Sequence, residues 1–458
     1  MNLKLRLTLL SFLQFFVWGA WLLTIGTYCF SAKGWTGAQF GAIFSTMAIS
    51  SIFMPAITGI IADKWINAER LYGILHILYG AFLFYVPQVN DPNTLYYVVL
   101  GAMLCYMPTI SLSNSISYTI LKRNNLDVVK DFPPIRVWGT IGFIAAAWAT
   151  NLSGSKANAN QFLIGAVAAI ALGIYSFTLP KCPPQKSITK GASIFEQLGL
   201  NAFKLFANYK MALFFIFSMF LGAALQLSNM YGDTFLDDFS KVPAYTDSFV
   251  VKYSTIIITV SQISETVFIL AIPFFLRRYG IKKVMLFAMI AWVLRFGLFS
   301  YGNPASVVDL GMIFLSCIVY GMAFDFFNIS GSLFVETTTD SKIRSSAQGL
   351  FMMMTNGVGA YVGIRVSGFI IDKYYTLKFT DIGSLIGHLK TDINNPAVKK
   401  LLGGNEVLAD NVLKSPVFIK QWHPIWFSFA IYALIVAVLF AVFFRHKHNP
   451  KEIGNVQH

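Results

Sequence analysis

The sequence predicts an all-helical membrane protein with twelve transmembrane helices in two six-helix halves. Three observations predict this class: the composition, the lengths of the apolar segments and the placement of the basic residues. Of the 458 residues, 56% are hydrophobic, 16% are aromatic and only 12% are charged. Soluble proteins carry about 25% charged residues, so this chain is suited to a lipid environment.

Twelve apolar segments are long enough to cross a bilayer, because about 20 residues of helix span the hydrocarbon layer. Transmembrane β-strands would be shorter and would alternate in polarity, so these continuous segments favour helices. The first segment is too long for a signal-peptide core and no cleavage site follows it, so we expect it to be retained. The segments are residues 6–30, 39–62, 69–88, 95–121, 134–152, 160–179, 210–235, 249–276, 283–301, 307–336, 345–372 and 423–444.

The basic residues predict the orientation, because short cytoplasmic loops are enriched in lysine and arginine. If the N-terminus is cytoplasmic, only Lys33, Lys156, Lys241 and Lys252 fall in short outer loops. We therefore expect a multi-pass protein of the bacterial inner membrane with both termini in the cytoplasm. The inner basic residues include Lys4, Arg6, Lys64, Arg70, Lys122, Arg123, Lys130, Lys181, Lys186, Lys190, Lys204, Lys210, Arg277, Arg278, Lys282, Lys283, Lys342, Arg344, Arg445, Lys447 and Lys451.

The same topology explains the net charge of +14 without nucleic acid. The basic residues lie in short loops, and no RNP or zinc-finger spacing accompanies them, so we expect no nucleic-acid partner. The lipid bilayer is the expected environment.

Two polar segments divide the chain. The basic segment 181–209 is predicted to be a cytoplasmic linker between an N-terminal half, 1–180, and a C-terminal half, 210–446. A cytoplasmic tail, 447–458, follows. The segment 373–422 between the last two predicted helices is polar and nearly neutral, and we expect it to form a disordered or partly helical cap on the outer side.

A partial loop motif occurs once in each half, at residues 59–64 and 277–283. Both copies resemble the cytoplasmic signature of the major facilitator superfamily, Gly-x-x-x-Asp-Arg/Lys-x-Gly-Arg/Lys, although the first lacks the later glycine and the second lacks the aspartate. Ordinary loop charge accounts for the lysines but not for the embedded glycine and aspartate. We expect a conformational latch between the halves on the inner face, formed by Asp63, Lys64, Arg277 and Arg278.

Polar side chains inside the apolar segments are the candidate site, because an ionisable group there costs roughly 2.5–3.5 kcal/mol on insertion scales. Several of them share helix faces, being three or four residues apart. They are Arg136, Thr140 and Phe143 on the fifth segment, Gln226 and Asn229 on the seventh, Gln262 and Glu265 on the eighth, and Tyr320, Phe324 and Asn328, with Asp325 at their edge, on the tenth.

Each candidate has a purely structural alternative. An amide such as Gln226 or Asn229 can form a hydrogen bond between helices. A carboxylate such as Glu265 or Asp325 can belong to a buried ion pair. Two carboxylates, an arginine, three amides and several rings near mid-helix exceed what packing requires, so we favour a function for the carboxylates. Possible ion-pair partners are Arg136, Arg295 and Arg365.

The remaining groups suggest neither a catalytic nor a metal site. His76 stands alone in its segment and is expected to be a neutral core histidine, whereas Glu336 and Arg365 lie near segment ends and can reach water. No pair among the four cysteines has metal-ligand spacing. His388, His423 and the acids of segment 373–422 follow no recognisable spacing, which disfavours a membrane-embedded enzyme acting on lipid-linked substrates.

The chemistry of these groups suits a neutral solute rich in hydrogen-bonding groups. Amides and carboxylates bind hydroxyls and ring nitrogens, and aromatic faces pack on a planar or sugar ring. Burial favours the neutral form of a carboxyl group and a nearby arginine favours the charged form, so such a group can take up and release a proton. There is no Walker motif for ATP. We therefore expect the proton gradient, and no cofactor, to drive transport.

Longer stretches of the chain resemble the nucleoside–proton symporter family of the major facilitator superfamily, in particular the NupG-type nucleoside permeases. The likeness is densest at residues 1–21, 131–143, 215–219, 261–266 and 323–331. It implies the major facilitator fold, a cavity between the halves with alternating access, and proton-coupled import of nucleosides. The segment 373–422 departs from the family pattern by being long.

The resemblance also implies roles for individual residues. The family's nucleoside and coupling positions carry over to Arg136, Thr140, Phe143, Gln226, Asn229, Gln262, Glu265, Tyr320, Phe324 and Asp325. We expect Glu265, Asp325 and Arg136 to couple the proton, and the amides and rings to hold purine or pyrimidine nucleosides. The alternative is another cargo on the same fold, a sugar or an exported drug. Because one chain supplies both halves, we expect a monomer.

Overall fold

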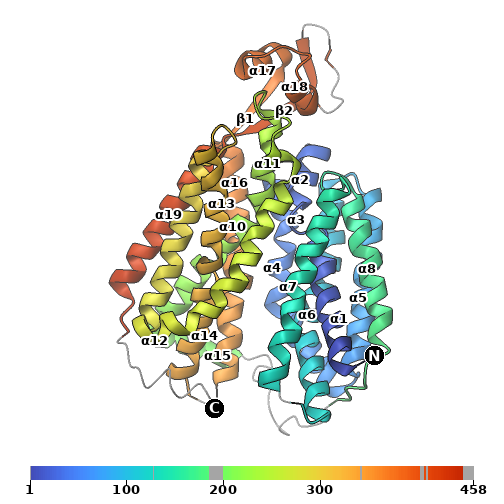
Figure 1. Cartoon of the computed structure of the whole chain (residues 1–458), viewed down its shortest axis with the longest axis vertical. Helices are drawn as coiled ribbons and strands as arrows, with labels where there is room; N and C mark the ends of the chain where they lie inside the picture. The colour runs from blue at the N-terminus through green and yellow to red at the C-terminus, as the bar shows by residue number, and fades with distance from the viewer. Residues whose placement is uncertain are drawn as a thin grey trace.

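The computed structural model is a bundle of long helices with a small cap at one end (Figure 1). It describes residues 2–126, 128–184, 200–340, 343–402, 407–408 and 411–446. The N-terminal half lies on the right in Figure 1. Its elements are α1 (Leu3–Gly19), α2 (Ile25–Thr27), η1 (Tyr28–Ala32), α3 (Gly37–Phe44), α4 (Thr46–Lys64), α5 (Ala68–Tyr85), η2 (Val86–Gln88), α6 (Pro92–Arg123), α7 (Val128–Leu152) and α8 (Asn160–Ser176).

The C-terminal half lies on the left in the same view. Its helices are η3 (Leu200–Ala207), α10 (Tyr209–Asp238), η4 (Phe239–Lys241), α11 (Phe249–Lys252), α12 (Ser254–Tyr301), α13 (Val307–Ala323), α14 (Asp325–Thr338), α15 (Arg344–Met352), η5 (Met353–Gly359), α16 (Ala360–Tyr374) and α19 (Trp422–Phe443). The cap consists of β1 (Thr376–Asp381), α17 (Ile382–Leu389), α18 (Pro396–Leu402) and β2 (Val412–Lys420).

The predicted membrane-spanning class is confirmed. Seven helices of the described chain are long and apolar enough to cross a bilayer by length and composition. The longest, α12, covers most of the predicted segment 249–276 and all of 283–301. Its path breaks between them at Gly280, where φ is 76° and ψ is 168°. Glycine adopts this left-handed region without a Cβ clash. Other predicted segments are divided into consecutive shorter helices, as α13 and α14 are at Phe324.

Corresponding helices approach each other closely in both halves. In the N-terminal half, a Cβ on Gly142 of α7 would lie 2.1 Å from the carbonyl oxygen of Phe12 in α1. In the C-terminal half, a Cβ on Gly222 of α10 would lie 1.8 Å from the carbonyl oxygen of Thr355 in η5. Small residues permit such backbone contact between membrane helices.

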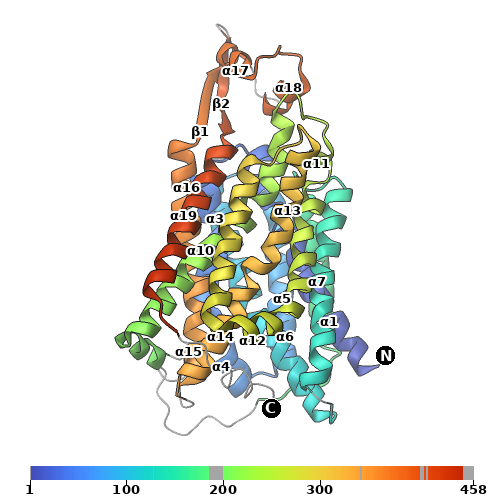
Figure 2. The same ribbon diagram turned by 60° about the vertical axis from the view of Figure 1, so that its left-hand side comes forward.

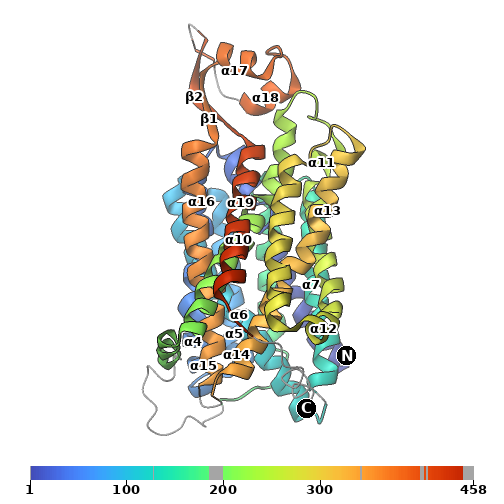
Figure 3. The same cartoon turned by 90° about the vertical axis from the view of Figure 1, so that its left-hand side faces the viewer.

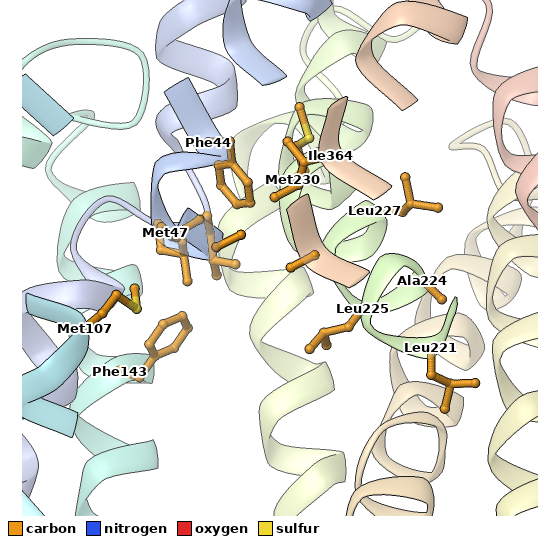
Figure 4. Close-up of a cluster of buried hydrophobic side chains, with 14 of the residues drawn as sticks. Phe44, Met47, Met107, Phe143, Leu221, Ala224, Leu225, Leu227, Met230 and Ile364 are labelled. Carbon is orange, nitrogen blue, oxygen red and sulfur yellow. The ribbon is translucent and has the colours of Figure 1, made fainter. Parts of the chain in front are cut away.

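The two halves meet along an apolar contact surface. Figure 4 shows Phe44 and Met47 of the N-terminal half opposite Met230 and Ile364 of the C-terminal half. Nearer the cap, the ring of Phe40 lies 6.0 Å from that of Tyr231. These contacts place α3 and α4 against α10 and α16.

The cap, formed by the described residues between 376 and 420, is a folded unit above one end of the bundle (Figures 2 and 3). Its two strands pair antiparallel, with Thr376 opposite Lys420. A small core of its own, including Leu385, Val398 and Val417, packs α17 and α18 against the hairpin. The expectation of helical structure is confirmed in part, because two short helices are present. The alternative of disorder is wrong for the described residues, and the strands were not predicted.

The cap is joined to the C-terminal half by two short connections. Tyr375 alone separates α16 from β1, and Gln421 alone separates β2 from α19. The backbone N–H of Gln421 donates to the carbonyl oxygen of Tyr375 at 2.9 Å. We call the end of the bundle beneath this unit the cap end.

Candidate functional site

The centre of the candidate site is a pair of carboxyl groups from two helices. Glu265 belongs to α12, and Asp325 begins α14 directly after the helix break at Phe324. Their side chains lie within hydrogen-bonding reach of each other. Asp325 is only 7% exposed, whereas Glu265 is half-buried. A helix N-terminus favours a negative side chain, which fits the position of Asp325.

Arg136 of α7 faces this pair from the other half. Its guanidinium interacts electrostatically with both Glu265 and Asp325. The same group lies 4.1 Å from the ring centre of Phe15 in α1, a cation–π distance that restrains its orientation. The three candidate coupling residues, far apart in the sequence, are therefore brought together between the halves.

Tyr320 and Arg295 support the pair from the C-terminal half. Tyr320 is buried in α13 and interacts electrostatically with both carboxyl groups. The guanidinium of Arg295 lies 4.5 Å from the Tyr320 ring centre. Its nitrogens donate to the hydroxyl of Ser228 at 2.8 Å and to the carbonyl of Ser316 at 2.9 Å. The ion-pair alternative thus fails for Arg295, whose contacts among the described residues are neutral groups.

Several candidate side chains retain polar or accessible surface inside the bundle. One carboxyl oxygen of Asp325 and Oε1 of Gln262 are buried without a hydrogen-bond partner in the part of the chain that the structure describes. An unpaired buried polar atom costs about 1–3 kcal/mol, so a bound solute with donors would be favoured here. The half-buried candidates are Thr140, Gln226, Asn229, Phe324 and Asn328.

Phe143 is buried and contacts a residue that sequence reasoning missed. Its ring lies 6.3 Å from that of Trp18 in α1, edge to face. The indole nitrogen of Trp18 is buried without a hydrogen-bond partner among the described residues. An isolated tryptophan in an apolar segment gives no sequence signal, but this one brings an unused donor close to Phe143.

Gln14 of α1 was also missed. Its amide donates to the hydroxyl of Thr109 at 3.0 Å and accepts from the hydroxyl of Tyr72 at 2.5 Å. The hydroxyl of Tyr106 donates to the backbone carbonyl of Gln14 at 2.8 Å. His76 packs beside this group, with its ring 4.2 Å from that of Tyr72, which agrees with the expected core histidine. Gln14 could have been noticed as an amide inside the first apolar segment.

The proposed inner latch stays a prediction. The side chain of Asp63 lies outside the described residues, and Lys64 is half-buried in the last turn of α4. Arg277 and Arg278 are exposed, and the guanidinium of Arg278 lies 5.8 Å from the ring centre of Tyr279.

A different set of polar contacts joins the halves at the cap end. The carboxylate of Asp372 accepts from the backbone N–H groups of Gly37 at 2.7 Å and Ala38 at 2.6 Å. The ammonium of Lys156 lies 2.7 Å from the carboxylate of Asp237. These contacts, which we term the cap-end latch, hold this end closed. Sequence reasoning missed them because each joins residues from different halves.

Comparison with known proteins identifies the family. The family model described as Nucleoside H+ symporter matches residues 1–449. The chain is 46% identical to xanthosine permease of Escherichia coli strain K12 over 454 residues, which are 99% of this chain and 98% of that protein. It is 45% identical to the nucleoside permease NupG of the same organism over 448 residues, 98% of this chain and 97% of the relative.

Solved structures agree with this. A crystal structure of the nucleoside transporter NupG matches with a TM-score of 0.83 and 45% identity. The match covers 98% of this chain and 100% of the NupG chain. A D-xylose–proton symporter matches with a TM-score of 0.67 at 11% identity, over 97% of this chain and 98% of that chain, and so shares the fold alone.

The match also corrects one expectation. Because the alignment covers 99% of this chain and 98% of xanthosine permease, the segment 373–422 is not an insertion that sets this protein apart. The family model, the sequence identities and the shared fold lead to one assignment: this chain belongs to the nucleoside H+ symporter family.

Proposed function

We propose that this protein imports nucleosides together with protons across the bacterial inner membrane by alternating access. The observation that supports the proposal most is the contact between Glu265 and Asp325, opposite Arg136 of the other half. Transporters commonly place such sites where two repeats meet. The relatives, which are nucleoside permeases, support the choice of cargo.

The carboxyl pair provides a means of coupling. Two carboxylates in contact repel each other strongly in a low-dielectric site, so the pair is stabilised by holding one proton. Loss of that proton strengthens the attraction of the pair for Arg136. Since Arg136 moves with the opposite half, the protonation state alters the free-energy difference between conformations. A proton crossing roughly 150 mV releases about 3.5 kcal/mol, enough to accumulate a neutral solute a few-hundred-fold.

The nucleoside would bind beside this pair. Gln226, Asn229 and Gln262 offer amide groups for hydroxyl and base-edge hydrogen bonds, and Phe143 and Phe324 offer rings. Thr140, Tyr320 and Asn328 extend this polar surface. We assign no chemical transformation to the site: the cargo is bound, carried and released.

The orientation is part of the proposal. We infer that the cap end faces the periplasm and that both termini are cytoplasmic. The four lysines expected in outer loops support this, because Lys33, Lys156 and Lys241 lie beside the cap or in the cap-end latch and Lys252 ends α11 next to them. We propose that the transporter acts as a monomer.

The test is uridine uptake into proteoliposomes containing Glu265→Gln, Asp325→Asn or the parent protein. A coupling residue should lose pH-driven accumulation by at least about tenfold, as removal of an essential charge typically does, while uridine counterflow persists. Asp247→Asn, which changes an exposed carboxylate outside the site, is the matched control.

Full pH-driven accumulation in both site variants would refute the coupling mechanism. Competition against labelled uridine tests the cargo. Other nucleosides should compete, and competition by free sugars of equal strength would favour the sugar-transport alternative.

A further inference from the structure

A second cavity lies at the cap end, away from the carboxyl pair. Its volume is about 650 Å³, within the range of pockets that hold small molecules. The N-terminal half contributes the stretch from Phe30 to Trp35, the C-terminal half contributes Lys241, and the cap contributes residues of α18 and β2. Three parts of the molecule therefore enclose one space.

The lining of this cavity is strongly cationic. Five lysines line it, and no aspartate or glutamate is among its described lining residues. They come from all three parts: Lys33, Lys241, Lys400, Lys414 and Lys420. A concave surface with one sign of charge focuses the field and attracts an oppositely charged solute.

The carboxylates nearest to the cavity are already engaged. Asp237 is paired with Lys156 at 2.7 Å. Asp238 is paired with Lys241 at 2.6 Å and accepts from the indole N–H of Trp422 at 2.9 Å. Asp237 and Asp238 thus balance two lysines, only one of which lines the cavity, and the nearby Asp372 accepts from two backbone N–H groups. Among the described residues, the lining lysines Lys33, Lys400 and Lys420 form no salt bridge, so they add positive charge to the cavity.

Lys420, at the end of β2, is the most deeply buried lysine of this lining for which a shifted pKa is found. Its ammonium lies 3.3 Å from the ring centre of Phe30 in the other half. Burial lowers its pKa to about 8, with repulsion by Lys241 adding to the shift and attraction by Asp238 and Asp372 opposing it. Burial also lowers the pKa of Lys400, with attraction by Asp237 opposing the shift and repulsion by Lys156 and Lys241 adding to it. A bound anion would relieve both.

Aromatic side chains complete the cavity. Phe30, Trp35 and Phe418 line it together with the lysines. Lysine binds phosphate as a point charge, and aromatic faces stack on nucleic-acid bases. The combination suits a phosphate group carried on a ring-bearing or otherwise partly apolar body.

We propose that this cavity binds a phosphate-bearing anion of about the size of a nucleoside monophosphate. The same chemistry is offered by a soluble nucleotide and by a phospholipid headgroup. Because its walls come from both halves and the cap, a bound anion bridges parts that must separate when the cap end opens. The site would therefore slow transport by stabilising the closed cap end.

The first experiment measures binding of uridine 5′-monophosphate to the purified full-length protein in neutral detergent. Lys420→Gln should weaken binding by about tenfold or more, as loss of a desolvated charge contact does, and Lys400→Gln, which changes an exposed lining residue, should weaken it by a smaller factor. Lys399→Gln is the matched control, because this exposed neighbour on α18 does not line the cavity. Size-exclusion chromatography checks folding, and excess uridine occupies the central site.

Further arms separate the sources of the phosphate. Displacement of the nucleotide by anionic phosphatidylglycerol in mixed micelles, but not by phosphatidylcholine, supports a lipid headgroup as occupant. Displacement by inorganic phosphate alone supports a soluble one. Equal affinity in all four proteins, or no binding of nucleotide, phosphate or anionic lipid, overturns the proposal.

The effect on transport rests on the proposed function, so it is measured separately. External uridine 5′-monophosphate should lower the maximal rate of uridine uptake in the parent and Lys399→Gln proteins but not in Lys420→Gln. If no protein takes up uridine, the proposed function fails while the binding measurement still decides the site. A rise in KM alone, equal in all proteins, would indicate competition at the central site and overturn the proposed inhibition.

Discussion

Arg295 is fully buried in the C-terminal half, yet its described contacts are hydroxyls, a carbonyl and aromatic rings. A buried charge with neutral partners is retained only where many hydrogen bonds and ring contacts compensate for lost hydration. Since it packs on Tyr320, which borders the carboxyl pair, we interpret Arg295 as a positioning residue for the site.

We predict that Arg295→Met raises the KM for uridine by about tenfold, a loss typical of a displaced binding group, and lowers the melting temperature. Arg295→Lys should recover part of the stability, but its KM should stay close to that of Arg295→Met. An ammonium cannot stack and donate in the same fork geometry as a guanidinium. Uptake kinetics and thermal unfolding in detergent measure both. An unchanged KM in a folded Arg295→Met protein would contradict the positioning role.

Lys420 predicts a pH dependence for anion binding at the cap-end cavity. Its pKa of about 8 lies below that of an ordinary lysine, so it is charged below pH 8 and loses its charge above. Affinity for uridine 5′-monophosphate should therefore be highest near pH 7, where the ligand phosphate is also charged, and fall as the pH rises through about 8.

Lys420→Arg, which stays charged over this range, should flatten that decline. Groups facing Lys420 are Asp238, Lys241 and Asp372, with Lys33, Lys400 and Lys414 around the cavity. Binding measured from pH 6.5 to 9.5 decides the point. A profile identical in the two proteins would rule out Lys420 as the titrating group.

The types of the site residues could be predicted from the sequence because polar groups are conspicuous in apolar segments. Arg136, Glu265 and Asp325 were found in that way. The contacts of Gln14 and Arg295 could not be predicted from the sequence, because their partners lie on other helices and their positions depend on the folded bundle.

At the level of elements, close backbone contact makes Gly222 sensitive to any side chain. A Cβ there would lie 1.8 Å from the carbonyl oxygen of Thr355, so α10 and η5 would have to separate. We predict that Gly222→Ala destabilises the protein by about 1–3 kcal/mol, the usual effect of overpacking. The control is Gly297→Ala, since nothing lies within 4 Å of a Cβ at that position. Equal melting temperatures for the two variants would refute the prediction.

Length and apolarity predicted the helices well because the bilayer imposes both. They could not predict the breaks within helices, such as that at Phe324, or the π-helical segments η1 and η5. The hairpin of the cap was missed because its strands are short, distant in sequence and separated by two helices. The available sequence signal for a strand was the alternation of apolar and polar residues, with Leu377 and Phe379 apolar. Both residues lie opposite residues of β2.

For the whole molecule, the cap-end latch predicts which conformation is stabilised. Asp372→Asn removes the negative charge to which the backbone N–H groups of Gly37 and Ala38 donate. Lys156→Gln removes the salt bridge with Asp237. Both should shift the population toward an open cap end, seen as faster hydrogen exchange in α3 and at the start of α12. Asp392→Asn, an exposed carboxylate in the cap, is the control. Unchanged exchange in both latch variants would show that other contacts hold this end closed.

The single-residue joints at Tyr375 and Gln421 have a practical consequence. Because both lead into the C-terminal half and bond to each other, we expect the cap to move with that half during the proposed alternating access. A fluorophore on exposed Asn394 and a second one on exposed Asn90, in the opposite half, would then form a molecular ruler. Changes in energy transfer between them would follow each turnover from the aqueous side, with no label inside the lipid.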